Sequence, residues 1–281
     1  SDPNFQLLKP PPIDLSFKFD FEMRDKRLLR MPSLMEVVTY CDERLSRSLI
    51  PDFPGAENGL QFENNGHVTK IGAAVDAGLI PFKKATEAGI DFLIVHHGMF
   101  WSPPYPVTGT LFNKYKLCVE NNLAVYGAHL PLDCHKEIGN NAILAKKLKL
   151  KTADWFLEYQ GNPIGLIAEG SLERSDLKNR LETLFPGGIT AIEKGSKQPE
   201  KIAILTGSGA SAVSELQKAG VDTLITGELK QNHFNEAEEA GLNLYACGHY
   251  ATETFGVRAL AEEVANKHGL EWEFIATDCP L

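Results

Sequence analysis

The stretch KIGAAVDAGLIPFKKATEAGIDFLIVHH, residues 70–97, occurs a second time in the chain as KIAILTGSGASAVSELQKAGVDTLITGE, residues 201–228. The two copies align without a gap, and each reads as a short apolar strand, a turn, a helix and a second apolar strand. Strands joined by a helical crossover are typical of parallel pairs in an α/β sheet. The sequence therefore predicts an α/β protein built from two interlinked, internally repeated modules.

The repeat continues past each copy. AVYGAHLPLD ends an apolar strand with His129 and places Asp133 four residues further on, and LYACGHYATE does the same with His249 and Glu253. A helix rich in Ala, Leu, Lys and Glu follows each of these segments. Two copies packed about a local twofold axis would bring their strand ends together, so we expect residues from both halves to meet there.

Composition limits the class of function. The chain has 281 residues, 43% of them hydrophobic, which is enough for a substantial core. Its formal net charge of −9 repels phosphate backbones and anionic lipids, which argues against nucleic acid as a partner. The five cysteines include no C-x-x-C pair, so a reducing, cytoplasmic compartment is expected. No apolar run approaches the roughly 18 residues that a membrane span needs.

Residues 1–31 differ from the rest of the chain. SDPNFQLLKPPP contains three consecutive prolines, and we expect it to lie outside the core as an arm or extension. LSFKFDFEM, residues 15–23, alternates apolar and polar residues, which predicts a strand with one buried face. The spacing then becomes helical, with Ser33 as the expected N-cap and Glu36 placed to complete a capping box.

Residues of the types that bind divalent metals lie at predicted strand ends in both halves: His96, His97, Asp133, His249 and Glu253. Imidazole nitrogens and carboxylate oxygens are common ligands of first-row divalent ions, and rigid strand ends hold them in place. A lone histidine is more often a hydrogen-bonded core or surface residue, but an adjacent pair with two H-x-x-x-carboxylate repeats favours a metal site. Two ions about 3.5–4 Å apart with a shared carboxylate, and a single ion with five ligands, both fit the spacing.

Several motifs together resemble one protein family. HHGMFW, GAHLPLDCH and GHYATETFG, with ENGLQF ahead of them, are similar to the Nif-three-like proteins, also known as GTP cyclohydrolase 1 type 2 homologues. The resemblance covers the chain from about residue 32 to its last residue. It implies two interlinked α/β domains, a toroidal homohexamer, and two divalent metal ions in each subunit. Imidazole and carboxylate ligands suit zinc, iron, manganese and cobalt alike.

The resemblance also implies roles for individual residues. It makes His96, His97, Asp133, His249 and Glu253 the metal ligands, and it matches His129 and His233 to further polar residues near the metals. The family often has an aspartate at the position of Glu228. The expected boundaries are 32–150 for the first α/β module, with 241–281 joining it to complete the metal-binding domain, and 151–240 for the second module.

The expected chemistry is hydrolysis. Two bridged divalent ions bring the pKa of bound water close to neutrality and polarise an acceptor oxygen, so a metal-bound hydroxide would attack the substrate. His129 is the candidate proton carrier or, alternatively, orients a metal ligand. The substrate is expected to be small, either a nucleotide or a phosphoester. The alternative function is a non-catalytic metal-binding scaffold or regulator that binds a protein partner.

Two other features have competing interpretations. TGSGASA, residues 206–212, contains G-x-G-x-x-A after a strand and formally matches a dinucleotide-binding fingerprint. The equivalent turn of the first copy lacks the second glycine, which favours ordinary strand-to-helix punctuation. The aromatic residues after the double histidine either line a substrate pocket or pack between subunits; they are Phe100, Trp101 and Tyr105.

Overall fold

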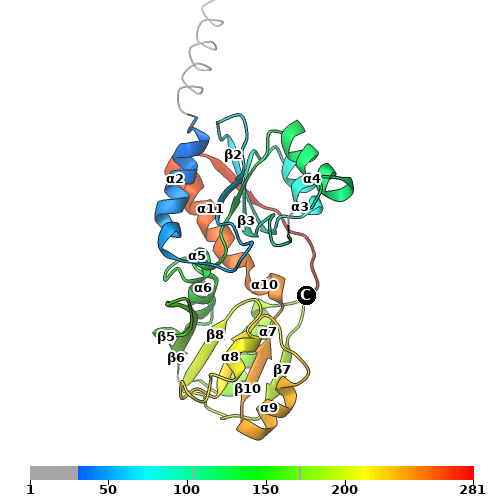
Figure 1. The fold of residues 1–281 in the computed structure, drawn as a ribbon. Helices are drawn as coiled ribbons and strands as arrows, with labels where there is room; N and C mark the ends of the chain where they lie inside the picture. Colours follow the sequence, from blue (N-terminus) through cyan, green and yellow to red (C-terminus); the bar gives the residue numbers. More distant parts are fainter. Residues whose placement is uncertain (1–30, 104, 171) are drawn as a thin grey trace, which may run out of the picture.

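The computed structural model describes residues 31–103, 105–170 and 172–281, so most of the expected N-terminal arm, with the strand at 15–23, lies outside it. The chain forms two β-sheets, each with its own helices, one above the other in Figure 1. The first sheet has the strand order β1-β4-β3-β2-β11 and the second the order β5-β6-β8-β9-β10-β7. This arrangement confirms the predicted α/β class.

The elements of the first half of the chain are α2 (Leu34–Arg44), the 3₁₀ turn η1 (Arg47–Leu49), β1 (Gly59–Phe62), β2 (Lys70–Asp76), α3 (Leu79–Glu87), β3 (Phe92–His97), α4 (Gly109–Glu120), β4 (Ala124–Gly127), α5 (Leu130–Asp133) and α6 (Asn140–Lys147). Those of the second half are β5 (Lys151–Tyr159), β6 (Asn162–Glu169), α7 (Arg174–Leu184), β7 (Thr190–Glu193), β8 (Lys201–Leu205), α8 (Ala210–Val213), β9 (Thr223–Thr226), α9 (His233–Ala240), β10 (Asn243–Ala246), α10 (His249–Thr252), α11 (Thr254–His268) and β11 (Glu271–Phe274). None of the helices in the described ranges is both long and apolar enough to cross a membrane.

Both copies of the sequence repeat form parallel strand pairs. β2 pairs in parallel with β3, β8 does so with β9, and the next strands, β4 and β10, extend each pair in the same direction. The copies differ in the crossover, because α8 is much shorter than α3 and continues as turns. There, Glu215 N donates to Ala212 O at 3.0 Å, the i→i−3 pattern of a 3₁₀ turn.

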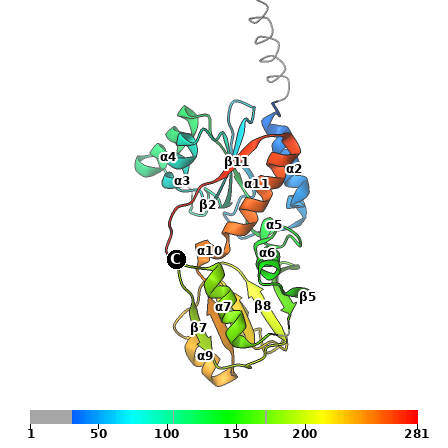
Figure 2. The same ribbon diagram turned by 180° about the vertical axis from the view of Figure 1, so that it is seen from behind.

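The first sheet is covered on both faces, which explains the unbroken apolar run FLIV in β3. Phe92 and Ile94 pack in one core cluster with α2 and α11, while Leu93 and Val95 pack in another with α3 and α4. Figures 1 and 2 show α2 and α11 together on one side of this sheet and α3 and α4 on the other. The carboxyl end of β3 is therefore held by packing on both sides.

The N-terminus of α2 forms the predicted capping box. Ser33 Oγ accepts a hydrogen bond from Glu36 N at 3.2 Å, and a Glu36 carboxylate oxygen accepts one from Ser33 N at 2.7 Å. The helix buries Val37, Val38 and Cys41 against the sheet. The cap fixes where the helix begins and therefore which of its faces covers the strands.

The two halves are interlinked, because the chain leaves the first sheet and later returns to it. After β10, helix α11 packs on β2 and β3, and β11 pairs in parallel with β2. In Figure 2 these last elements lie in the upper half of the molecule, beside α2. The return begins after β10, which is a strand of the second sheet. The boundary expected at residue 241 lies just before β10, whereas the chain returns to the first sheet just after it.

Candidate metal centre

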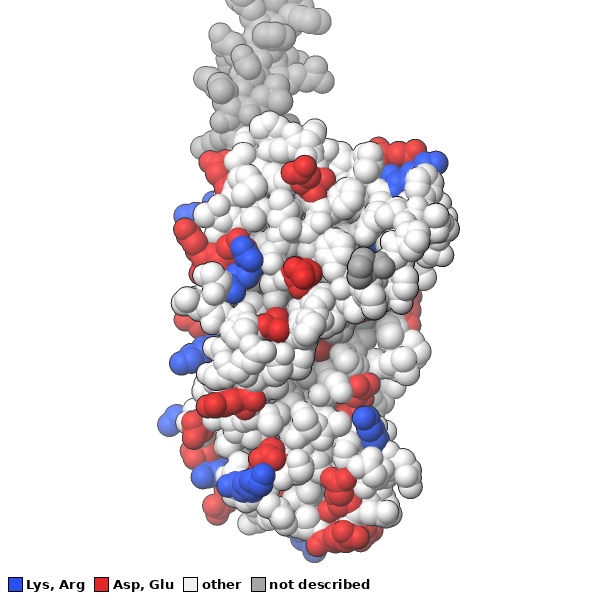
Figure 3. Space-filling model, viewed as in Figure 1, with Lys and Arg blue, Asp and Glu red and all other residues white. Residues whose placement is uncertain are grey.

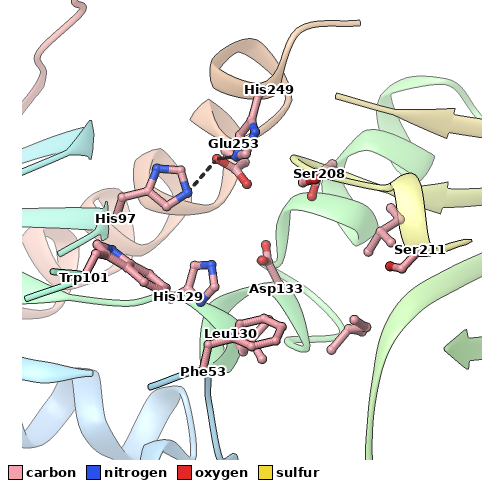
Figure 4. Close-up of a pocket in the computed structure, with 13 residues that line it drawn as sticks. Phe53, His97, Trp101, His129, Leu130, Asp133, Ser208, Ser211, His249 and Glu253 are labelled. Atoms are coloured by element: carbon pink, nitrogen blue, oxygen red, sulfur yellow. Dashed lines mark ion pairs between the residues drawn. The ribbon is translucent and has the colours of Figure 1, made fainter. Parts of the chain in front are cut away.

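The five predicted metal ligands lie together where the two sheets meet. His96 and His97 end β3, Asp133 ends α5, His249 begins α10, and Glu253 follows α10. Ligand atoms within 4.8 Å of one another form three groups: His96, His97 and His129; His97, His249 and Glu253; and His96, Asp133 and Glu253. Figure 4 shows His97, His129, Asp133, His249 and Glu253 pointing toward a common space.

Glu253 lies at the centre of the cluster, and its two oxygens face different partners. Oε1 is 3.5 Å from His96 Nε2, while Oε2 is 3.2 Å from His97 Nε2 and 3.2 Å from His249 Nε2. His96 Nε2 is also 3.4 Å from Asp133 Oδ2. Ligand atoms at about 2.1 Å from one ion lie roughly 3.0–3.4 Å apart for octahedral to tetrahedral angles. These separations therefore fit ligands that share an ion.

Two polar atoms at the centre make no hydrogen bond to the described part of the chain. His96 Nε2 and Glu253 Oε2 are buried and accept or donate no hydrogen bond among the described residues. A buried polar atom left unpaired costs about 1–3 kcal/mol, and such groups usually have a partner. Since both atoms are ligand types and face the other members of the cluster, a divalent ion would satisfy them. The residues fit a metal.

The two adjacent histidines are oriented through their other ring nitrogens. His96 Nδ1 donates to Ala128 O at 2.8 Å, and His97 Nδ1 donates to Asp76 Oδ1 at 2.8 Å. Each hydrogen bond leaves Nε2 free to face the cluster, the arrangement usual for metal-binding histidines. Asp76 ends β2 directly opposite His97 in the parallel register. Because Asp76 ends the strand next to β3, its position in the sequence could have predicted its role as the partner of His97.

Asp133 and His249 also have supporting partners. Asn140, fully buried at the start of α6, donates from Nδ2 to Asp133 Oδ1 at 2.8 Å and accepts from Gly256 N at 2.7 Å. Glu228 Oε1 lies 3.4 Å from His249 Nδ1. Asn140 therefore ties the carboxylate of Asp133 to the start of α11. Glu228 faces the outer nitrogen of His249, the position that an orienting carboxylate takes.

His129 is held by a loop that precedes β1. Its Nδ1 donates to Asp52 Oδ1 at 2.8 Å, and its backbone N donates to Asn58 Oδ1 at 2.7 Å. Asn58 in turn donates to Asp52 Oδ2 at 2.7 Å. Burial opposes the charge on Asp52, yet the hydrogen bond from His129 holds the pKa of this carboxyl below its usual value. His129 groups with His96 and His97 through a ring nitrogen within 4.8 Å of theirs, and because Nδ1 is bonded to Asp52, Nε2 is the nitrogen left for the cluster.

The electrostatics of the metal-free cluster favour positive charge. Although burial disfavours a charged imidazole, the carboxylates of Asp133 and Glu253 hold the pKa of His96 well above its ordinary value. The neighbouring carboxylate of Glu253, 3.2 Å from His249 Nε2, raises the pKa of His249 to about 9. Burial opposes the charge on Glu253, but His96 and His249 keep its pKa far below the ordinary range. Without metal, His96 and His249 therefore hold protons that a bound metal ion would displace.

A cavity of about 410 Å³ opens beside the cluster. Trp101 belongs to its lining, whereas Phe100 and Tyr105 are not among the described residues that line it. Ser208, from the turn between β8 and α8, and Ser211, from α8, face the cluster from the opposite side in Figure 4. The hollow between the two halves is visible on the face drawn in Figure 3. Both halves therefore contribute to one cavity.

The Duf34/NIF3 (NGG1p interacting factor 3) family model matches residues 33–280. The chain belongs to the Duf34/NIF3 family. The expectation drawn from the histidine motifs is thereby confirmed, because the match spans both sheets and every residue of the cluster.

Curated relatives and solved structures agree with the Duf34/NIF3 assignment. The GTP cyclohydrolase 1 type 2 homologue of Deinococcus radiodurans is 38% identical over 245 residues, which cover 85% of this chain and 91% of the relative. The homologue of Archaeoglobus fulgidus is 36% identical over 244 residues, 86% of this chain and 97% of the relative. The crystal structure of TTHA1606 from Thermus thermophilus has a TM-score of 0.79 and 38% identity, and the match covers 89% of this chain and 100% of that one. The Nif-three-like fold is confirmed.

The glycine turn has a specific place in this Duf34/NIF3 protein. Gly207 has φ +67°, and a Cβ there would collide with Glu253 Oε1. Gly207 O accepts hydrogen bonds from Gly227 N and Glu228 N at 2.9 and 3.1 Å, which hold the turn against the cluster. The motif is therefore more than strand-to-helix punctuation, because only a glycine lets the second half approach the central carboxylate this closely.

His233 is not part of the cluster. It is buried at the start of α9, where its Nδ1 accepts a hydrogen bond from Lys230 N at 3.0 Å. The groups of potential ligand atoms found between residues 31 and 281 do not include it. In this Duf34/NIF3 structure the side chain holds the start of a helix, and the expected place near the metals is not seen.

Proposed function

We propose that this Duf34/NIF3 protein is a hydrolase with a dinuclear metal centre. His96, Asp133 and Glu253 Oε1 would hold one divalent ion, and His97, His249 and Glu253 Oε2 would hold the other. The observation that carries the proposal is the central carboxylate of Glu253, whose two oxygens face different histidines, together with the lack of any hydrogen bond from the described residues to its buried Oε2 and to His96 Nε2. A carboxylate shared between two ions is the usual arrangement of two-metal hydrolases.

The protein groups around the centre suit proton transfer. Divalent ions held there would supply Lewis acidity and an activated water at neutral pH. His129 presents Nε2 to the cluster and would take a proton from the attacking water at that atom, then return it to the leaving group. Asp52, bonded to Nδ1 of the same ring, would orient the imidazole and stabilise its charged form. These contacts support His129 as the proton carrier, with Asp52 as its positioning residue.

The cavity favours catalysis over a purely structural centre. A structural metal site is closed by protein ligands, whereas a catalytic one keeps a position open to substrate. Here His97, Asp133, His249 and Glu253 belong to the lining of a cavity of about 410 Å³. A small molecule can therefore reach the cluster. Nucleotides and phosphoesters are the classes to assay first, since the names of the relatives refer to a GTP cyclohydrolase.

The test combines metal content with turnover. Elemental analysis is expected to find two ions per chain, and a panel of nucleotides and phosphoesters is expected to contain a substrate whose hydrolysis a chelator abolishes. His129→Ala should keep both ions and lose about 100-fold or more in rate, because it removes only the proton carrier. A full complement of metal without chelator-sensitive turnover on any compound would instead favour the scaffold or regulatory function.

A further inference from the structure

The cavity beside the metal cluster has one aromatic end. Trp101 lies edge-on to the His129 ring, with centroids 4.8 Å apart and an interplanar angle of 80°. Phe53 lies 6.1 Å from the same ring and 4.2 Å from Tyr159. Trp101 is 38% and Phe53 39% exposed, so both keep apolar surface uncovered within the cavity. Two such rings around one imidazole make a surface on which a flat ring can stack.

The opposite end of the cavity carries hydroxyl groups. Ser208, in the turn between β8 and α8, and Ser211, in the first turn of α8, are exposed and line the cavity. Figure 4 shows them across the cluster from Trp101 and Phe53. A serine hydroxyl both donates and accepts hydrogen bonds without adding charge. This end therefore suits uncharged polar groups such as amides, amines and sugar hydroxyls.

The cavity offers little to a multiply charged ligand. No Lys or Arg belongs to the described residues that line it, and its carboxylates, Asp133 and Glu253, lie in the cluster. Phosphate chains are normally bound by cationic side chains, helix N-termini or metal ions. Outside the metal centre, the described lining gives no cationic partner to a second or third phosphate. An anionic group is therefore accommodated only at the ions.

We infer that this cavity takes a substrate with an uncharged flat ring and at most one anionic group, which sits at the metal centre. The inference rests on the proposed function and restricts its class of substrate. The ring stacks on Trp101 and Phe53, and its polar substituents bond to Ser208 and Ser211. The substrate class is a nucleoside, a nucleoside monophosphate or a similar heterocyclic compound, and the extra phosphates of a nucleoside triphosphate add nothing to its binding.

Titration calorimetry on the metal-loaded protein tests the inferred substrate class. The ligands compared differ either in the base or in the number of phosphates. Guanosine monophosphate should bind about tenfold tighter than ribose 5-phosphate, because only the first has a ring to stack. Guanosine triphosphate should bind no tighter than the monophosphate. A tenfold gain from monophosphate to triphosphate would overturn the inference, as would equal affinities for the monophosphate and ribose 5-phosphate, or no monophosphate binding at about 1 mM.

A pair of variants locates the ring. Trp101→Ala should weaken binding of the monophosphate by about tenfold and leave that of ribose 5-phosphate unchanged. Phe100→Ala, an exposed aromatic of the same loop outside the described cavity lining, should change neither. Equal effects of the two substitutions would contradict the stacking site. Elemental analysis of each variant and a separate turnover assay keep this result apart from a failure of the hydrolase proposal, since binding is measured without catalysis.

Discussion

At the scale of single residues, Glu253 decides how the cluster can work. Its side chain is only 4% exposed, and its oxygens face His96 on one side and His97 and His249 on the other. Substituting a shared ligand should affect both ions, whereas substituting an outer ligand should affect one. The number of ions that each variant retains therefore distinguishes two ions that share Glu253 from a single ion.

We expect Glu253→Gln to lose both ions and His97→Ala to lose only the ion shared with His249. Removing a ligand that serves one site leaves His96, Asp133 and Glu253 in place for the other. Elemental analysis after dialysis against a weak chelator measures the ions per chain. Retention of both ions in either variant would show that the ligands are assigned wrongly.

The raised pKa of His249 predicts a pH dependence. In the metal-free protein its pairing with Glu253 is complete below the ordinary histidine pKa and is lost as pH rises through about 9. A metal must displace this proton, so apparent affinity should fall about tenfold per pH unit below that value for each proton released. Competition with a chromophoric chelator across this range measures the slope. An apparent metal affinity that does not change with pH would contradict the release of a proton when metal binds.

The sequence predicted the residues that form the cluster but not the groups that orient them, for a physical reason. His96 and His97 follow a buried strand, and the second copy of that strand ends in Gly227 and Glu228, so the fold does not require histidine there. Asp52 lies in a loop 77 residues before His129, and Asn140 opens a helix seven residues after Asp133. No periodic pattern relates either residue to the strand ends. Their partners depend on tertiary packing.

At the scale of elements, the turn between β8 and α8 brings the second half against the centre. Gly207→Ala should weaken metal binding, because the new Cβ collides with Glu253 Oε1, and should also cost about 1–2 kcal/mol of stability from the positive φ. Elemental analysis and denaturant unfolding measure the two effects.

Gly220→Ala is the matched control for this substitution. Gly220 has φ +65°, close to the +67° of Gly207, but a Cβ there meets nothing within 4 Å. It should lose similar stability and keep all of its metal. If the two variants bound metal equally well, the close approach of the turn to Glu253 would have no role in the centre.

The elements were predictable where apolar periodicity was strong. The parallel pairs of both repeats and the cap at Ser33 follow from local patterns. The antiparallel pairing of β10 with β7 does not, because β8, β9 and α9 separate these two strands in the sequence. For the same reason, the fit of Gly207 against Glu253 could not be read from a short glycine motif.

At the scale of the whole molecule, the centre joins segments that span most of the chain. His96 belongs to the first sheet, while His249 and Glu253 lie where the chain returns from the second. Bound metal should therefore stabilise the folded protein as a unit. At a free metal concentration of about 100 times Kd the gain is about 2.7 kcal/mol. Chelation should lower Tm by roughly 5–10 °C in calorimetry, and an unchanged Tm would contradict this coupling.

The central claim is that two ions share Glu253, and anomalous diffraction at the metal absorption edges tests it most directly. We predict two anomalous peaks about 3.5–4 Å apart, one beside His96 and Asp133 and the other beside His97 and His249, with Glu253 between them. A single peak coordinated by all five ligands, or no peak in the cluster of the metal-supplemented protein, would contradict the dinuclear centre.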